Sequence, residues 1–249
     1  MLSSKNVSSD GPLSDPLRIA WPPLIPGRLI RRYQRFLADV CLNTGETVTA
    51  HCPNSGRMIG CAEPGRPVYL SFHDSPKRRL KYTWELIDMR GTLVGVNTLV
   101  PNRLVALAAA NGLIPEFQGG VTVRTEVVVG SHTRLDLCLT DTRGRNIFVE
   151  VKNCTLVEDG RALFPDAVTA RGRKHLEVLG ELRRAGHRAV IFFVVQRMDA
   201  EWFSPADHID PDYGQALRQA HDQGVEMLAY DATLDLGGIA LNRGLPLAL

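Results

Sequence analysis

The chain has 249 residues, of which 44% are hydrophobic, and its formal net charge is +2. This length suits two domains, and this composition is ample for two hydrophobic cores. The longest apolar run, Ala189 to Val195, is too short to cross a membrane, so a membrane protein is excluded. Five cysteines without a Cys-x-x-Cys pair favour neither a disulfide framework nor a zinc ribbon, and they fit a reducing cytoplasm.

The N-terminal part of the chain predicts an arm followed by a small barrel. Residues 1–26 are rich in serine and proline and lack periodicity, so we expect a loose arm, and no apolar stretch marks a signal peptide. Residues 27–96 contain short strand patterns with no long helix between them, which predicts a closed barrel of the OB type. The strand patterns cover residues 36–42, 46–52, 67–73, 80–89 and 92–96.

Positive charge is concentrated in this predicted barrel, because residues 27–100 carry eleven Lys and Arg against six Asp and Glu. Basic loops beside aromatic residues on such a barrel are typical of proteins that bind single-stranded nucleic acid. Tyr82 and Trp84 supply the aromatics; the alternative is that they belong to the barrel core and that the charges only confer solubility. The basic residues form two clusters, namely Arg28, Arg31, Arg32 and Arg35, and Lys77, Arg78, Arg79 and Lys81.

Residues 97–249 predict an α/β domain with a mixed sheet. The order of elements begins α-β-β-β-α-β, with an antiparallel hairpin early in the domain and, through one further helix, a right-handed crossover between the later parallel strands. Asp210 and Pro211 mark the start of a helix, and Gly186 and Gly224 mark helix ends. The expected helices cover residues 101–110, 169–185 and 211–223, and the expected strands cover 121–129, 133–139, 146–152, 188–195 and 225–230.

The hairpin of residues 133–152 carries the candidate site. A three-residue turn ending at Gly144 fixes the pairing, since a glycine adopts the left-handed conformation there without strain. In this register Asp136 stands directly opposite Glu150, and Lys152 lies one step along on the same face. The other face is apolar and is formed by Leu135, Leu137, Leu139, Ile147, Val149 and Val151.

Two opposed carboxylates repel each other by roughly 3 kcal/mol at a spacing of ~5 Å and an effective dielectric constant of about 20. In a cleft they need a cation, and hard divalent ions such as Mg²⁺, or Mn²⁺, prefer carboxylate oxygens. A lysine beside the pair can hold a phosphate or a water molecule. The alternative is a solvated hairpin face with a weak Lys–Glu pair. The opposed aspartate favours the metal site.

Seven sequence blocks, taken in order, resemble the sugar fermentation stimulation protein A family over residues 28–249. The resemblance implies an OB-like barrel followed by a PD-(D/E)XK nuclease-like α/β domain with a mixed sheet. It also implies DNA binding and a link to the regulation of sugar utilisation. The blocks are 35–40 (RFLADV), 51–56 (HCPNSG), 82–86 (YTWEL), 95–98 (GVNT) with 101–103 (PNR), 134–136 (RLD), 149–153 (VEVKN), and 164–169 (FPDAVT) with 171–175 (RGRKH).

The resemblance maps the aspartate, the acidic residue and the lysine of the nuclease pattern onto Asp136, Glu150 and Lys152. A further acidic metal ligand often comes from upstream in such nucleases. Glu126 is the better candidate here, because a loop at residues 130–132 would pair it with Asp136 in a row of three carboxylates. Glu116 is the alternative.

Two functions remain open on the sequence. The first is a Mg²⁺-dependent nuclease that acts on DNA, single strands included, and in which Arg171 and Lys174 of the following helix neutralise phosphates. The second is a DNA-binding regulator of sugar-utilisation genes in which the same site is idle. His175, next to Lys174, is interpreted as an ordinary helix-surface histidine.

Overall fold

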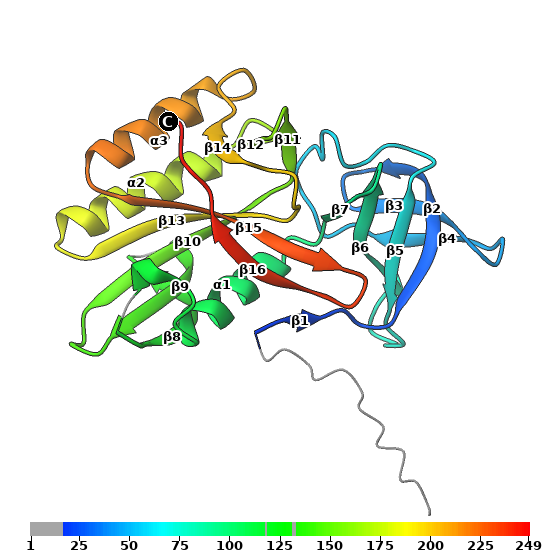
Figure 1. Cartoon of the computed structure of the whole chain (residues 1–249), viewed down its shortest axis with the longest axis horizontal. Helices are drawn as coiled ribbons and strands as arrows, with labels where there is room; N and C mark the ends of the chain where they lie inside the picture. Colours follow the sequence, from blue (N-terminus) through cyan, green and yellow to red (C-terminus); the bar gives the residue numbers. More distant parts are fainter. Residues whose placement is uncertain (1–16, 118, 131–132) are drawn as a thin grey trace, which may run out of the picture.

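The computed structural model describes residues 17–117, 119–130 and 133–249. A β-barrel lies beside a larger α/β part, and the short segment between strand β7 and helix α1 joins them (Figure 1). The barrel consists of β2 (Leu24–Tyr33), β3 (Leu37–Leu42), β4 (Thr47–His51), β5 (Pro67–Phe72), β6 (Tyr82–Met89) and β7 (Thr92–Gly95).

The barrel strands lie in the order β4-β3-β2-β5-β6-β7, and a parallel pairing between β4 and β6 closes the barrel. Trp84 is fully buried in its core, and its indole N–H donates to the carbonyl of Leu86 over 2.9 Å. Tyr82 is half-buried and packs against the same core. Of the two interpretations of these aromatics, the core is therefore the right one for Trp84.

A seven-stranded mixed sheet forms the centre of the α/β part, in the order β1-β16-β15-β13-β10-β9-β8. The three middle strands β15, β13 and β10 run parallel, and the other neighbours are antiparallel. The central strand β13 is apolar and buried on both faces, as expected for a covered parallel strand. The strands are β1 (Ile19–Ala20), β8 (Val121–Val129), β9 (Thr133–Asp141), β10 (Asn146–Cys154), β13 (Arg188–Val195), β15 (Glu226–Asp235) and β16 (Gly238–Gly244).

Helices cover both faces of this sheet. The helices α2 (Ala170–Arg184) and α3 (Pro211–Asp222) pack on one face, and α1 (Val100–Ala110) packs on the other (Figure 1). The side chain of Thr169 caps α2 by accepting from Gly172 N over 3.0 Å, and Asp210 caps α3. None of the helices in the described part of the chain has the length and apolar character that a membrane crossing needs.

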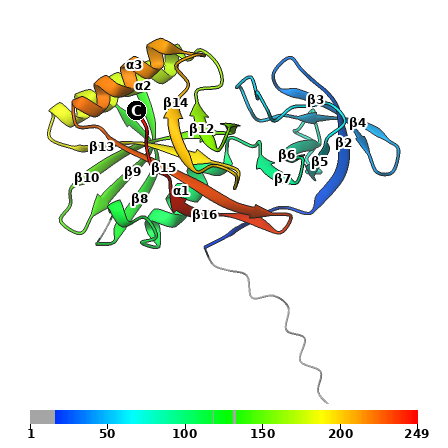
Figure 2. The same cartoon turned by 45° about the horizontal axis from the view of Figure 1, so that its top comes forward.

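Two predictions about irregular segments are corrected. Residues 1–16 of the predicted loose arm lie outside the described residues, but residues 17–26 are not loose, since β1 pairs with β16 and β2 begins at Leu24. The segment after β10, where neither a helix nor a strand was expected, holds β11 (Leu156–Glu158) and β12 (Arg161–Phe164). These strands form a small sheet with β14 (Trp202–Pro205), and this sheet lies towards the barrel (Figure 2).

Polar contacts fix the barrel against the α/β part. The backbone of Gly95 donates to the carbonyl of Gln196 over 2.9 Å, and the Gln196 side-chain amide donates to the carbonyl of Asn97 over 3.1 Å. At a second point of contact between the barrel and the α/β part, Met58 N donates to the carboxylate of Asp166 over 2.7 Å. These bonds join residues far apart in the chain, so the junction is built from both parts.

Candidate functional site

The hairpin of β9 and β10 follows the predicted register as far as the pair of Leu137 and Val149, and the ladder ends there. Beyond that row, Leu135 packs on the face covered by α2 and α3, whereas Leu137 packs on the face covered by α1. The predicted six-residue apolar face is therefore wrong at Leu135. The predicted ladder pair of Asp136 with Glu150 is also absent from the described pairings.

The side chain of Asp136 makes hydrogen bonds just beyond the point where the regular pairing of β9 with β10 ends. Its Oδ2 accepts the backbone N–H of Val151 over 2.8 Å, and its Oδ1 accepts from the side-chain amide of Asn102 over 2.8 Å. Asn102 lies in the first turn of α1. Hydrogen bonds to both oxygens therefore fix the orientation of this carboxylate.

Glu150 is bound by two basic side chains at one of its oxygens. Its Oε1 accepts from Lys152 Nζ over 2.6 Å and lies in direct contact with Nδ1 of His175, which comes from α2. The side chain of Glu150 is only 3% exposed, and that of Lys152 is 14% exposed. Arg171 Nε lies 3.4 Å from Nε2 of the same histidine. His175 is thus buried against the site, and its interpretation as a surface histidine is wrong.

The two carboxylates lie close enough to affect each other. Burial raises the pKa of Asp136 above its usual value, and the negative charge of Glu150 raises it further. Burial also acts to raise the pKa of Glu150, but the hydrogen bonds and charges of His175 and Lys152 outweigh it, so that this pKa lies below its usual value. At neutral pH, Glu150 is therefore held as an anion beside an Asp136 whose ionisation is disfavoured.

The environment of Glu150 Oε2 tests whether these residues suit a divalent cation. It is buried and has no hydrogen-bond partner in the described part of the chain, which is a costly arrangement for a carboxylate oxygen. Together with the oxygens of Asp136 it offers the hard ligands that a divalent cation prefers. Across residues 17–117, 119–130 and 133–249, no three His, Cys, Asp or Glu side chains group closely enough to hold a metal ion. The residues fit an ion that completes its coordination with water or substrate oxygens.

The third carboxylate predicted from the sequence does not join this site. Glu126 lies in the expected row between the pairs of Thr125 and Val127 with β9, but it is itself unpaired and its φ of 54° is left-handed. Its exposed side chain forms an ion pair with Arg134 over 2.7 Å. The alternative, Glu116, accepts from the hydroxyl of Tyr230 over 2.8 Å. The predicted row of three carboxylates is therefore wrong.

The first basic cluster of the barrel is divided between different roles. Arg32 is structural, because its guanidinium donates to the carbonyls of Asn54 and Gly56, each over 2.8 Å. Arg31 is exposed and pairs with Asp39 over 2.8 Å. Arg35 is exposed, and it makes no hydrogen bond or ion pair with any described residue.

The second basic cluster is more exposed. Lys77 and Arg79 are exposed and have no ion pair or hydrogen bond to the residues that the structure describes. Arg78 donates to the hydroxyl of Thr83 over 2.8 Å, and Lys81 pairs with Asp74 over 2.8 Å. On α2, Arg171 and Lys174 are both exposed, and Arg171 is the one that reaches the site through His175.

Two residues of the site were missed by the sequence analysis. Asn102 was quoted only as part of a sequence block, and a search for acidic side chains could not find an amide that orients a carboxylate. His175 was placed on the wrong face of its helix. The signal for His175 was its position four residues after Arg171, which puts both on one side of α2.

A closed barrel of the OB type, followed by an α/β domain with Asp136 and the Glu150–Lys152 pair on its β9–β10 hairpin, defines a barrel joined to a nuclease-like domain. Two family models match the chain, "SfsA N-terminal OB domain" at residues 30–96 and "Sugar fermentation stimulation protein RE domain" at residues 99–238. The chain belongs to the sugar fermentation stimulation protein family. The predicted fold class, an OB-like barrel followed by a PD-(D/E)XK nuclease-like α/β domain with a mixed sheet, is confirmed.

Individual relatives agree over nearly the whole chain. The sugar fermentation stimulation protein homolog of Geotalea uraniireducens is 58% identical over 217 residues, which cover 87% of this chain and 94% of the relative. That of Geotalea daltonii is 56% identical over 229 residues, covering 92% and 98%. The solved structure of Pyrococcus furiosus SfsA in complex with Ca²⁺ superposes with a TM-score of 0.85 at 28% identity, covering 93% of this chain and 98% of that one.

Proposed function

We propose that this protein binds DNA and hydrolyses phosphodiester bonds with the help of a divalent cation, Mg²⁺ or Mn²⁺, at Asp136 and Glu150. The observation that carries the proposal is the buried Oε2 of Glu150, which has no hydrogen-bond partner among the described residues and lies beside an Asp136 whose pKa is raised by burial and by that neighbouring charge. A relative of known structure is in complex with Ca²⁺, another hard divalent cation, which supports a cation in this family.

Asp136 and Glu150 would hold the cation through their oxygens. When bound, such an ion polarises a phosphate and makes a water molecule a better nucleophile at neutral pH. Asn102 holds Asp136 in place, and His175 does the same for Glu150. These contacts keep both carboxylates oriented before substrate arrives, so that little reorganisation is needed.

Lys152 has a separate role beside the carboxylates. Its ammonium group is 2.6 Å from Glu150 Oε1 and 3.4 Å from His175 Nδ1. An ammonium group carries three donors. One of them serves Glu150, and another can orient a water molecule or a phosphate oxygen. Arg171 lies just beyond His175, where it can take a second phosphate of the strand.

A specific observation favours the alternative, a non-catalytic DNA-binding regulator of sugar-utilisation genes. Glu126 stays outside the site, which leaves two carboxylates in place of three. A cation at such a site could serve binding alone. The two functions therefore predict the same structure and differ only in whether the protein cleaves DNA.

Incubation of the purified protein with single-stranded and double-stranded DNA, with Mg²⁺ or Mn²⁺ against EDTA, tests the proposal. We expect cleavage that requires the cation and that falls at least a hundredfold in Lys152→Ala. The control is Arg143→Ala, an exposed cationic residue of the turn between β9 and β10, whose cleavage should change far less. Cleavage that persists in Lys152→Ala refutes the assignment, and DNA binding without cleavage under any of these conditions supports the regulator.

A further inference from the structure

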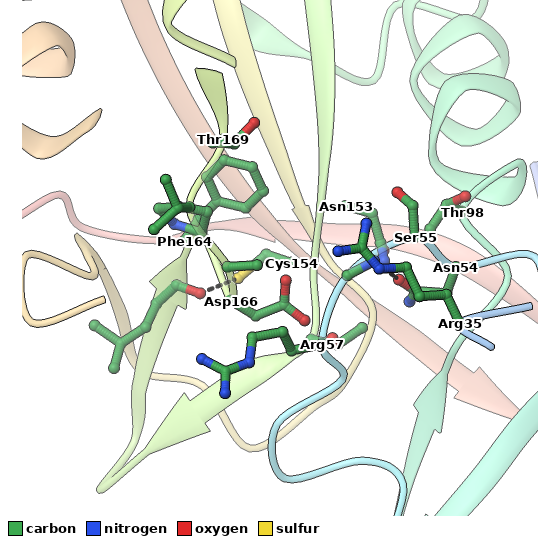
Figure 3. Close-up of a pocket in the computed structure, with 16 residues that line it drawn as sticks. Arg35, Asn54, Ser55, Arg57, Thr98, Asn153, Cys154, Phe164, Asp166 and Thr169 are labelled. Atoms are coloured by element: carbon green, nitrogen blue, oxygen red, sulfur yellow. Dashed lines mark hydrogen bonds between the residues drawn. The ribbon is translucent and has the colours of Figure 1, made fainter. Parts of the chain in front are cut away.

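A pocket of about 320 Å³ lies where the barrel meets the α/β part (Figure 3). Arg35, Ser55 and Arg57 line it from the barrel, and Asn153 and Asp166 are among the residues that line it from the α/β part. This volume is near the lower end of the ~300–1,000 Å³ range of ligand pockets. It therefore suits one mononucleotide-sized group and is too small for a base pair.

The pocket is held open by hydrogen bonds around its wall. Asp166 accepts from Met58 N over 2.7 Å, and Thr98 donates to the carbonyl of Pro53 over 2.7 Å. Asn153 is fixed by the side-chain amide of Gln196, which donates to it over 2.7 Å. These contacts bind the polar groups to the scaffold, so the pocket is preformed and does not need a ligand to assemble it.

Two guanidinium groups at this pocket have no partner among the described residues. Arg35 and Arg57 are exposed, and neither side chain makes a hydrogen bond or ion pair with the residues that the structure describes, although the backbone carbonyl of Arg57 accepts from Arg32. Arg32, in the same stretch of chain, is bonded to three backbone carbonyls. A pair of free guanidinium groups at one pocket is the arrangement that recognises a phosphate.

The turn between β2 and β3 places Arg35 in a left-handed backbone conformation, which a residue other than glycine adopts at a cost. Gln34 and Arg35 have φ values of 47° and 61° between β2 and β3, where Asn-Gly is the preferred pair in such a turn. A side chain in this conformation costs on the order of 1 kcal/mol relative to glycine. Strain of this kind persists mainly at binding and catalytic sites. Here it keeps a guanidinium at the pocket where glycine would be more stable.

Apolar side chains line the same pocket. Phe164 and Val168 are among them, and Val168 is 71% exposed. Exposed apolar groups beside free cations suit a ligand that has both an aromatic ring and a phosphate. An unpaired nucleotide has both.

The pocket adjoins the candidate site along β10. Cys154 lines the pocket and lies on the same face of this strand as Glu150, four residues further along. At ~3.3 Å per residue, the carboxylate lies about 13 Å away along the strand. A nucleotide in the pocket would therefore place a neighbouring phosphate near Asp136 and Glu150.

We propose that this interdomain pocket holds one unpaired nucleotide of a DNA strand, with its phosphate bound by Arg35 and Arg57, next to the bond that is cut. The proposal rests on the proposed function, because it names the substrate class as DNA with a single-stranded end or gap. The barrel and the α/β part then recognise the substrate jointly at their junction.

Binding in EDTA tests the pocket without cleavage. The probes are two fluorescein-labelled DNA hairpins of the same stem, one blunt and one with three unpaired nucleotides, measured by fluorescence anisotropy between about 50 and 200 mM salt. We expect the wild-type protein to bind the hairpin with the overhang at least tenfold more tightly. Equal affinity for both hairpins overturns the proposal.

Substitutions at the pocket test whether it causes the preference for the hairpin with unpaired nucleotides. The double variant Arg35→Asn with Arg57→Ala should lose at least tenfold in affinity for the overhang and lower the salt slope by about 1 to 2. Asparagine is chosen because it tolerates the left-handed backbone. Ser55→Trp fills the pocket without changing charge and should abolish the preference. The control is Arg143→Ala, an exposed arginine of the β9–β10 turn at the far end of the hairpin, which should behave as wild type.

A second measurement reports whether the unpaired base enters the pocket. 2-Aminopurine at the first unpaired position should be shielded from acrylamide quenching in the wild-type complex and not in Ser55→Trp, with circular dichroism confirming that the variant is folded. Free dAMP distinguishes a strand from a soluble nucleotide, and binding of dAMP without any overhang preference overturns the proposal. A pocket-dependent preference without cleavage in Mg²⁺ or Mn²⁺ would refute the nuclease and leave the nucleotide site standing.

Discussion

Replacing Glu150 with glutamine removes one charge from a cluster that depends on it. In the folded protein the Glu150 carboxylate accepts from Lys152 over 2.6 Å and contacts His175, and its side chain is 3% exposed. The change keeps the shape of the side chain but leaves two basic groups without their anion. Breaking a buried ion pair from one side costs ~3–5 kcal/mol. Because the Lys152 side chain retains 14% exposure, we expect about 2–3 kcal/mol of lost stability.

The assay is equilibrium unfolding in urea and differential scanning calorimetry, both in EDTA so that no cation contributes. For a chain of this size, a loss of about 2–3 kcal/mol lowers the midpoint temperature by roughly 4–12 °C. The matched control is Glu177→Gln, an exposed glutamate on α2 without a partner in the described part of the chain. It should change stability by less than about 0.5 kcal/mol.

A double variant separates lost attraction from uncompensated charge. Glu150→Gln with Lys152→Met removes both partners, and it should recover a large part of the lost stability, because no buried ammonium group is then left unpaired. A Glu150→Gln protein within about 0.5 kcal/mol of wild type would refute this reasoning. It would mean that water, and not Glu150, satisfies Lys152.

Other perturbations test the junction, the thiols and the barrel. Gly95→Ala should cost ~1–3 kcal/mol, since its Cβ would lie 2.6 Å from the hydrogen-bonded side chain of Gln196; unaltered urea unfolding would contradict this. Burial raises the pKa of Cys61 to about 12, so at pH 8 its thiolate fraction is on the order of 10⁻⁴. We expect DTNB to label Cys41 alone rapidly in the native protein, and a second fast thiol would count against this packing. Lys77→Ala should lower the salt slope of DNA binding by about 0.7–0.9, and an unchanged slope would place the bound strand elsewhere.

Local features of the chain predicted most of the fold. The turn residue Gly144 has a φ of 77°, and the pairing that it sets is observed up to Leu137 and Val149. Helices α2 and α3 begin where Thr169 and Asp210 cap them. Each of these features depends on residues close together in sequence, so it can be predicted from one amino-acid sequence.

The parts of the site that sequence analysis missed depend on tertiary structure. Asn102 reaches Asp136 from a helix 34 residues earlier, and His175 reaches Glu150 from one 25 residues later. Which residue of β10 a side chain of α2 meets is decided by packing, and no spacing in the chain reports it. The prediction that Glu126 joins the site was wrong for another reason. Glutamate rarely adopts a left-handed backbone, so the sequence did not indicate that β8 would be irregular at this residue.

The irregular row through Asp136 explains why such contacts can form. Below it, Val123 and Leu137 pack on the face covered by α1; above it, Val127 and Leu135 pack on the face covered by α2, so β8 and β9 change face together. In a regular hairpin, the side chains opposite each other share one face. Asp136 would then lie beside Glu150 on the side of α2, out of reach of α1. The break in the ladder therefore lets Asp136 reach Asn102 of α1 while it stays near Glu150. Its cost, a lost pairing and a left-handed residue worth ~1–3 kcal/mol, is offset by the apolar rows that pack regularly on either side.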